Sequence, residues 1–263
     1  MKYLFDHWEQ IKKELHHKYI LFLFDFDGTL TPITKTPQQA VLGEGTRTLL
    51  KKLTLYPDCT LAIVSGRSLE DIEGKVGLKN IIYVGNHGLE IQGPQISFES
   101  PVSVSSKAAI RQIYDEMAAK LASLPGALVE DKGVAVSVHY RLVDSCKMRD
   151  FLSIFSEVTE PYLAHRKIKI TEGKRVYEIK PVLPWDKGKI ALWLLMRQQF
   201  LIKDKKVLPV YFGDDLADEE AFGALKNRGL TVFVGETKSS KAAYFVRNPE
   251  ETAGFIKQFL EQG

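Results

Sequence analysis

The stretch Tyr19–Ile33 constrains the fold of this chain more than any other. Tyr19–Asp25 is apolar except for its last residue, which is the pattern of a strand buried on both faces of a sheet. Asp25 and Asp27 lie at the end of this strand, next to Gly28, where the backbone can turn sharply. Because an extended chain points these two carboxylates to the same side, their like charges require a cation or a proton between them. Carboxylate oxygens are hard ligands, so this strand end predicts a Mg²⁺ site.

Two other interpretations of the Asp-x-Asp-Gly pattern remain open at this point. An ordinary turn after a strand also contains Asp-Gly in many proteins, with no functional role. A calcium-binding loop begins in the same way, but it continues with a further acid and a Glu, and Thr29–Pro32 contains neither. The other predicted strand ends therefore decide between a turn and a functional site.

The composition is that of an ordinary globular protein with room for two compact units. The 263 residues are 26% charged and 44% hydrophobic, with a formal net charge of +3. The basic residues are spread along the chain, so we expect neither a nucleic acid nor a membrane surface as a partner. No apolar run reaches the roughly 18 residues that span a bilayer, and the charged N-terminal segment lacks the apolar centre of a signal peptide. Cys59 and Cys146 form no disulfide or metal pattern. We expect a cytoplasmic protein that is monomeric.

A second buried strand ends in a small hydroxyl residue. Cys59–Val64 is followed by Ser65, Gly66 and Arg67, and a helix is predicted to begin near Leu69. Ser65 would be able to cap this helix. Its position one βα unit after the first motif instead favours binding of a phosphate oxygen together with backbone amides. Arg67 is then expected at the rim of the cleft.

A third short strand, Ile81–Val84, runs into two glycines that flank Asn86 and His87. This arrangement is equally compatible with a plain turn and with side chains presented to a cleft.

Charged residues also gather where two later helices are predicted to begin. Lys187 lies beside the start of the predicted helix Lys189–Phe200, where the helix dipole also attracts anions, and Lys189 is the competing candidate for a phosphate ligand. The buried strand Val207–Phe212 ends in Asp214, Asp215, Asp218 and Glu219. One acid in the first turn of a helix is an ordinary dipole partner. Four acids within six residues at a strand end predict the second half of the Mg²⁺ site.

Residues 101–180 follow a different pattern and predict an inserted unit. Two helices alternate with two pairs of strands: the helices are Ser105–Leu124 and Asp144–Thr159, and the strands are Ala127–Asp131, Val134–Tyr140, Ile168–Thr171 and Arg175–Lys180. This αββαββ order predicts an α+β cap domain, with an antiparallel sheet and both helices on one face. Residues 1–100 and 181–263 predict an α/β core domain with a Rossmann-like parallel sheet and helices on both faces.

The other face of the antiparallel sheet is predicted to be polar. Alternation directs Val134, Val136, Val138 and Tyr140 toward the helices. The same alternation places six polar side chains on the opposite face: Glu130, Lys132, Ser137, His139, Arg141 and Glu178. Charged residues on an exposed sheet are often only solvated, but this mixture of donors and acceptors suits sugar hydroxyls.

The motifs taken together resemble a known family. DFDGTLTPI, VSGR, GNHG, VEDKG, HYR, YEIKP, WDKG and FGDDLADE are similar, in this order and over nearly the whole chain, to the trehalose-6-phosphate phosphatases of the haloacid-dehalogenase-like superfamily. The core motifs specify the superfamily, whereas GNHG, EDKG, HYR and YEIKP resemble the trehalose-phosphate branch. Ala217 is a departure, because a hydroxyl residue is more familiar at its position.

The resemblance implies a magnesium-dependent phosphatase that hydrolyses a small sugar phosphate. By resemblance, Asp25 is the nucleophile, Asp27 is the acid and base, and Ser65 and Lys187 hold the phosphoryl oxygens. The implied metal residues are Asp25, Asp27 through its carbonyl, Asp214, Asp215 through a water, and Asp218, which also orients Lys187. The implied sugar-binding residues are Arg67, Asn86, His87, Glu130, Lys132, His139, Arg141 and Glu178.

Two alternatives to trehalose 6-phosphate hydrolysis stay open. One is a phosphatase of the same fold that acts on sucrose phosphate or a mannosyl-phosphoglycerate. The other is a catalytically idle sugar-phosphate sensor, which is disfavoured because every chemical group that the reaction needs is present.

Overall fold

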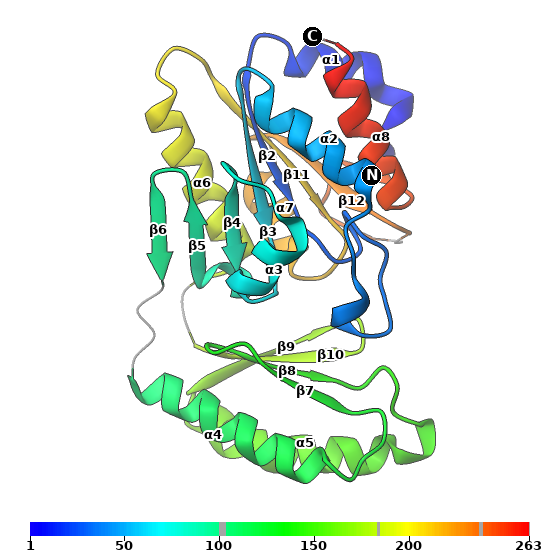
Figure 1. Ribbon diagram of the computed structural model, residues 1–263, viewed down its shortest axis with the longest axis vertical. Coiled ribbons are helices and arrows are strands. Elements are labelled where there is room, and N and C mark those ends of the chain that lie inside the picture. The colour runs from blue at the N-terminus through cyan, green and yellow to red at the C-terminus, as the bar shows by residue number, and fades with distance from the viewer. Residues whose placement is uncertain (100–103, 183–184, 237–238, 263) are drawn as a thin grey trace. The chain divides into compact units, whose positions relative to one another are not determined.

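In the computed structural model, the apolar stretch at Tyr19 forms β2 (Tyr19–Phe24), the central strand of a nine-stranded sheet (Figure 1). The structure describes residues 1–99, 104–182, 185–236 and 239–262, without the side chains of His87, Val104 and Ser105. The chain divides into two compact units, which we call unit 1 (Met1–Glu99 with Trp185–Gly263) and unit 2 (Ser100–Pro184). The segment expected to form a cap, residues 101–180, lies within unit 2.

The sheet of unit 1 is parallel except at one edge. Its strand order is β1 (Lys2–Tyr3), β13 (Tyr244–Val246), β12 (Leu230–Val234), β11 (Val207–Gly213), β2, β3 (Cys59–Val64), β4 (Ile82–Gly85), β5 (Glu90–Gly93) and β6 (Ile96–Glu99). Neighbouring strands from β1 through β4 pair in parallel, and β5 and β6 pair antiparallel. The predicted parallel core is therefore confirmed.

Side chains of β2 alternate between two cores on opposite faces of this sheet. Phe22 and Phe24 pack with one set of helices, α1 (Trp8–Leu15), α2 (Glu44–Leu55), α3 (Leu69–Val76) and α8 (Pro249–Leu260). Leu21 and Leu23 pack with α6 (Lys187–Leu201) and α7 (Asp218–Leu225) on the other face. Helices thus cover both faces, as the sequence predicted (Figure 1).

The edge strands β5 and β6 and the first strand, β1, are not among the strands that the sequence predicts. β5 and β6 form a hairpin around Pro94 and Gln95, and β1 pairs with β13. These strands have two to four residues each. Such lengths are too short for a strand period to be recognised.

Unit 2 contains a four-stranded antiparallel sheet with two helices. The strand order is β7 (Leu128–Asp131), β8 (Val136–His139), β10 (Val176–Pro181) and β9 (Ile168–Gly173), and the helices are α4 (Val104–Leu121) and α5 (Met148–Ala164). Val136, Val138 and Tyr140 pack with Ile113 of α4 and Phe151 of α5 in one core. The predicted αββαββ order and the apolar face are therefore present.

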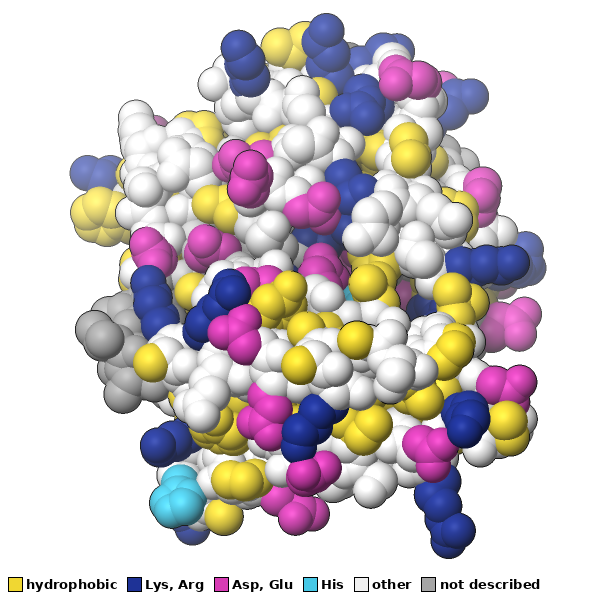
Figure 2. All heavy atoms as spheres, turned by 60° about the horizontal axis from the view of Figure 1, so that its bottom comes forward, with side chains coloured by type: hydrophobic (Ala, Val, Ile, Leu, Met, Phe, Trp, Pro, Cys, Tyr) yellow, Lys and Arg dark blue, Asp and Glu magenta, His cyan; other side chains and the backbone are white. Residues whose placement is uncertain are grey.

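Short 3₁₀ turns connect several of these elements, at Phe5–His7, Pro37–Gln39, Asn86–Gly88 and Ser145–Lys147. Among the described residues, no helix combines the length and apolarity that crossing a membrane requires. Figure 2 shows basic and acidic side chains interspersed over the face in view, which agrees with the spread of charge along the sequence.

We predict that Phe22→Ala destabilises the protein strongly. Phe22 is fully buried, and its ring stacks with that of Phe24. The centroids of the Phe22 and Phe259 rings are 4.9 Å apart. Loss of such a ring typically costs about 3–5 kcal/mol of unfolding free energy. The matched control is Phe200→Ala, since the Phe200 side chain is exposed and its loss should change stability by less than about 0.5 kcal/mol. Urea unfolding measures both, and equal losses would contradict this account of the core.

Candidate active site

The ends of three adjacent parallel strands bring the motif residues of unit 1 together. β2 lies between β3 and β11, and Phe24 pairs with both Ile63 and Phe212. Asp25, Ser65 and Asp214 follow these strand ends directly, and all three are buried. Parallel strands place their carboxyl ends at one edge, so the topology alone assembles this cluster.

Gly28 allows the acidic turn after β2 to pack against Asp214. The backbone of Gly28 has a φ of +90°, and a Cβ added there would lie 2.1 Å from Asp214 Oδ2. Both facts require glycine at this position. The neighbouring Thr29 hydroxyl donates to Asp214 Oδ1 over 3.4 Å, which ties the two strand ends together.

Lys187 enters the cluster from the first turn of α6. Asp186 caps this helix, because its Oδ1 accepts the Lys189 N–H at 2.8 Å, and the helix therefore begins two residues earlier than expected. The buried Lys187 ammonium lies 2.9 Å from Asp25 Oδ1 and 2.7 Å from Asp218 Oδ1. Of the two lysine candidates, Lys187 faces the acids, whereas Lys189 is exposed.

Asp218 is a hub of four hydrogen bonds. Its Oδ1 accepts from Lys187 and from the Tyr211 hydroxyl at 2.8 Å. Its Oδ2 accepts the backbone N–H groups of Asp214 and Asp215, at 3.0 and 3.1 Å. Both oxygens are thus engaged in holding the lysine and the loop after β11.

Asp215 stabilises the start of α7. Its Oδ1 accepts the N–H groups of Ala217 at 2.9 Å and of Asp218 at 3.2 Å. The bond at Ala217 uses only the backbone, so this capping does not require a hydroxyl side chain there.

The buried charges shift one another's pKa values. Burial raises the pKa of Asp25 well above its ordinary value; Lys187 opposes this shift, and Asp218 and Asp214 add to it. Burial also raises the pKa of Asp218, to about 7, again against the effect of Lys187. Burial acts to lower the pKa of Lys187, but Asp218 and Asp25 outweigh it and raise that pKa well above its ordinary value. The cluster therefore contains more carboxylates than its ammonium balances.

The donor set of this cluster fits a hard divalent cation. Asp25, Asp214 and Asp218 each offer a carboxylate oxygen, and these oxygens lie within 4.8 Å of one another. Because both oxygens of Asp218 are engaged, Asp25 and Asp214 are the pair best suited to bind a metal. Oxygen donors of this kind suit Mg²⁺.

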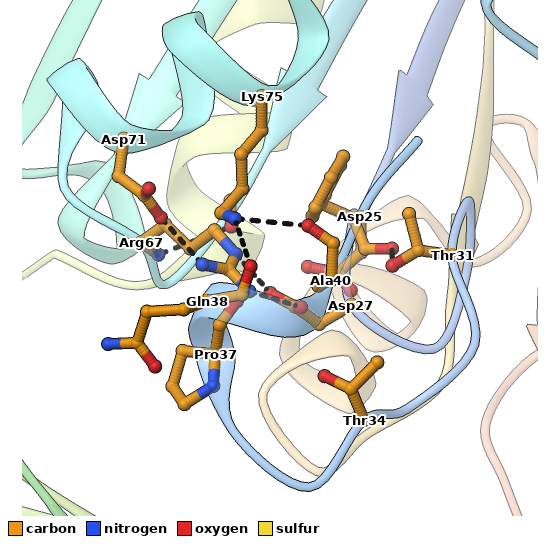
Figure 3. A network of polar contacts seen from close by, with 12 residues as sticks. Asp25, Asp27, Thr31, Thr34, Pro37, Gln38, Ala40, Arg67, Asp71 and Lys75 are labelled. Carbon is orange, nitrogen blue, oxygen red and sulfur yellow. Dashed lines mark hydrogen bonds and ion pairs between the residues drawn. The ribbon is translucent and has the colours of Figure 1, made fainter. Parts of the chain in front are cut away.

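Ser65 and Arg67 both follow β3, but only the Ser65 side chain is placed to bind an anion. Ser65 Oγ accepts the Arg67 N–H at 3.2 Å, which leaves its hydroxyl proton for an anion. Arg67 is buried and not at a rim as expected: its guanidinium binds both oxygens of Asp27, each at 2.7 Å (Figure 3).

Asn86 is buried in the turn after β4. Its N–H donates to the Arg67 carbonyl at 2.6 Å, and its side-chain amide donates to Glu90 at 2.5 Å. These bonds favour the turn interpretation of Asn86. The side chain of His87, the other predicted residue of this motif, lies outside the described part of the structure.

On unit 2, the predicted polar residues form a row across the sheet. Ser137 pairs in register with Glu130 on one side and Glu178 on the other. Glu178 Oε1 accepts from Lys132 at 3.1 Å and from Ser137 at 2.8 Å. His139 lies 3.0 Å from Glu130; although burial acts to raise the pKa of Glu130, the bond to His139 and the Lys132 charge lower it.

The sequence also predicts Arg141 on this face of the sheet. It lies beyond the end of β8, and its guanidinium donates to the Lys174 carbonyl at 2.7 Å.

Comparisons with known proteins agree with this architecture. The family model described as trehalose-phosphatase matches residues 23–250. "Probable trehalose-phosphate phosphatase H" of Arabidopsis thaliana is 34% identical, over 97% of this chain and 76% of the relative. The C-terminal domain of a trehalose-6-phosphate phosphatase of C. albicans shares the fold, with a TM-score of 0.80 at 24% identity and 94% of each chain covered. A haloacid dehalogenase-like hydrolase from Bacteroides thetaiotaomicron has a TM-score of 0.63 at 16% identity, over 92% of this chain and all of that one.

The fold, with acidic residues at the ends of adjacent parallel strands, places the chain in the class of α/β proteins that these solved structures represent. The matched family model and the plant relative narrow this class. The chain belongs to the trehalose-phosphatase family and is a phosphoric monoester hydrolase.

Tyr211 and Asp71 each contact a site residue, and neither was predicted from the sequence. Tyr211 is fully buried and bonds Asp218, and Asp71 bonds Arg67 at 2.6 Å. A tyrosine within the otherwise apolar strand VLPVYF is the one available signal for Tyr211, because a buried hydroxyl needs a partner.

We predict that the metal-free protein loses stability as the pH rises and that Mg²⁺ restores it. The pKa of Asp218 is about 7 in the folded protein, against 3.8 ordinarily, and that of Asp25 is also raised. The folded state therefore binds more protons than the unfolded state, and this stability is present at low pH and lost as the pH rises through about 7.

The measurement is urea unfolding at about pH 5 and about pH 8, with chelator and with Mg²⁺. The increase in unfolding free energy that Mg²⁺ produces should be larger at the higher pH, and it should be smaller in Asp214→Asn than in the wild type. A gain that is the same at both pH values in the wild type would refute the buried charge excess.

Proposed function

We propose that this enzyme hydrolyses trehalose 6-phosphate to trehalose and phosphate, with Asp25 as the nucleophile and Mg²⁺ as the cofactor. The observation that carries the proposal is the buried cluster in which Lys187 lies 2.9 Å from Asp25 at the end of the central strand. The substrate follows from the family and from the names of its relatives.

The reaction proceeds in two steps on unit 1. An Asp25 oxygen attacks phosphorus, the bond to the sugar oxygen breaks, and Asp27 gives its proton to that oxygen. Asp27 then takes a proton from water, whose oxygen attacks the aspartyl-phosphate and releases phosphate and free Asp25. Lys187 and the Ser65 hydroxyl hold the phosphoryl oxygens during both steps. Bound by Asp25, Asp214 and the Asp27 carbonyl, Mg²⁺ would neutralise charge on the phosphoryl group.

The polar row on the sheet of unit 2 is proposed to bind the sugar. Lys132, Ser137 and Glu178 form a buried set of donors and acceptors, and Glu130 and His139 extend it. The phosphoryl-binding residues act alike on every ester, so discrimination between sugars requires such a separate set. We also propose that the enzyme acts as a cytoplasmic monomer in trehalose biosynthesis.

We predict that the wild type prefers trehalose 6-phosphate and that Asp25→Asn abolishes its turnover. An amide does not attack phosphorus, yet it has the shape of the acid and removes one of the crowded buried charges, so the fold should persist. Phosphate release is measured on trehalose 6-phosphate, sucrose 6-phosphate and a mannosyl-phosphoglycerate, with Asp204→Asn, an exposed aspartate, as the matched control.

Near-normal release by a folded Asp25→Asn protein would remove the nucleophile assignment. Preference for another sugar phosphate would instead assign the enzyme a different substrate, and binding without any turnover would support a sensor.

We predict that Glu178→Gln selectively weakens hydrolysis of trehalose 6-phosphate. A charged hydrogen bond to a sugar hydroxyl is typically worth about 1.5–3 kcal/mol, or roughly ten- to a hundredfold in kcat/KM. p-Nitrophenyl phosphate carries no sugar, so its hydrolysis should change much less. Glu160→Gln, an exposed acid on α5, is the control. Equal losses on both substrates would show that Glu178 supports the fold or the chemistry.

A further inference from the structure

We propose that Arg67 is a positioning residue that fixes the acid and base Asp27, and that it does not bind the substrate. This inference rests on the proposed function, because it concerns the residue that protonates the departing sugar. It revises the sugar-binding role that the sequence suggested for Arg67.

The donors of Arg67 are already engaged within unit 1. Nε and Nη2 donate to the two oxygens of Asp27, each at 2.7 Å. Nη1 donates to Asp71 at 2.6 Å, and Nη2 also donates to the Pro37 carbonyl at 2.8 Å. These bonds occupy four of the five N–H donors of a guanidinium. Little capacity remains for a phosphate or a sugar hydroxyl.

The position of Arg67 also differs from that of a ligand-binding arginine. Its side chain is 6% exposed, whereas that of Asp27 is 42% exposed. The guanidinium carbon lies 5.5 Å from the centre of the Phe26 ring, over its face. In the described part of the chain, the hydrogen bonds to the Asp27 carboxylate come from Arg67 alone. Arg67 is therefore the buried support, and Asp27 is the group presented to solvent.

An arginine is suited to hold the Asp27 carboxylate because its guanidinium group is planar. Two parallel N–H bonds to both oxygens of a carboxylate fix the plane of that carboxylate as well as its location. A lysine ammonium would supply the charge without the second fixed bond. Proton transfer depends on such geometry, since the acid must lie within hydrogen-bond reach of the departing oxygen.

Helix α3 anchors this support and the adjoining loop together. Asp71 lies in the first turn of α3, where its N–H donates to the Ser68 hydroxyl at 3.3 Å. From the same helix, Lys75 donates to the carbonyls of Gln38 at 3.3 Å and Ala40 at 3.0 Å, next to the Pro37 carbonyl that Arg67 binds (Figure 3). One helix thus holds both the acid and the loop that follows it.

The test separates leaving groups that need an acid from those that do not. A sugar alkoxide leaves slowly unless it is protonated, whereas p-nitrophenolate leaves without a proton. In Arg67→Lys and Arg67→Gln, single-turnover release of trehalose from trehalose 6-phosphate should fall by about tenfold or more, while the first-turnover release of p-nitrophenol should change less than about threefold. Thermal unfolding is measured for each variant.

The matched control is Arg111→Lys, because Arg111 also bridges two aspartates, Asp115 and Asp131, on the surface of unit 2. It should change neither rate. In an Asp27→Asn background, adding Arg67→Lys should cost little more, since a residue that acts through Asp27 has nothing left to position.

Three results would overturn this inference alone, and a fourth would overturn the proposed function as well. A raised KM for both esters with unchanged kcat would make Arg67 a substrate ligand. Equal rate losses on both esters, together with a lowered melting temperature, would make the role of Arg67 purely structural. The same conclusion would follow if adding Arg67→Lys to Asp27→Asn reduced the rate by as much as Arg67→Lys does in the wild type. A wild type that released no trehalose would refute the proposed function itself, and with it the role of Asp27 on which this inference depends.

Discussion

Unbalanced negative charge, buried at the end of the central strand, is the constraint on which the site depends. Asp25, Asp214 and Asp218 are each at most 5% exposed, and Lys187 is the buried cation bonded to two of them. Burying an ionised carboxylate is costly unless it is paired. A bound divalent cation would remove the remaining excess, so the same arrangement explains both the raised pKa values and the proposed need for Mg²⁺.

The surrounding fold holds this charge in a fixed geometry. Adjacent parallel strands supply the acids, and Gly28 lets Asp214 approach the turn after β2. Two helices on opposite faces of the sheet then hold the remaining groups: α6 contributes Lys187, while α3 supports Asp27 through Arg67. The nucleophile and the acid are thus fixed by separate elements, which would allow each to be adjusted without moving the other.

Many of the strands and site residues were predictable from the sequence, because local patterns of apolar and polar residues indicate them. Long apolar runs with polar ends identified β2, β3 and β11, and alternation identified the polar face that holds Ser137 and Glu178. Pairings between distant residues were not predictable. Nothing in VSGR shows that Arg67 turns inward to Asp27, 40 residues away along the chain. Such contacts depend on which strands become neighbours, and that is decided by the whole fold.

Direct detection of the phosphorylated residue tests the central claim. Asp27→Asn should form the aspartyl-phosphate from p-nitrophenyl phosphate, whose leaving group needs no acid, and should hydrolyse it slowly for want of a base. Acid quenching in the presence of Mg²⁺, followed by mass spectrometry of peptides, should place the phosphoryl group on Asp25. Release of p-nitrophenol with no phosphorylated peptide, or with the group on another residue, would contradict the account.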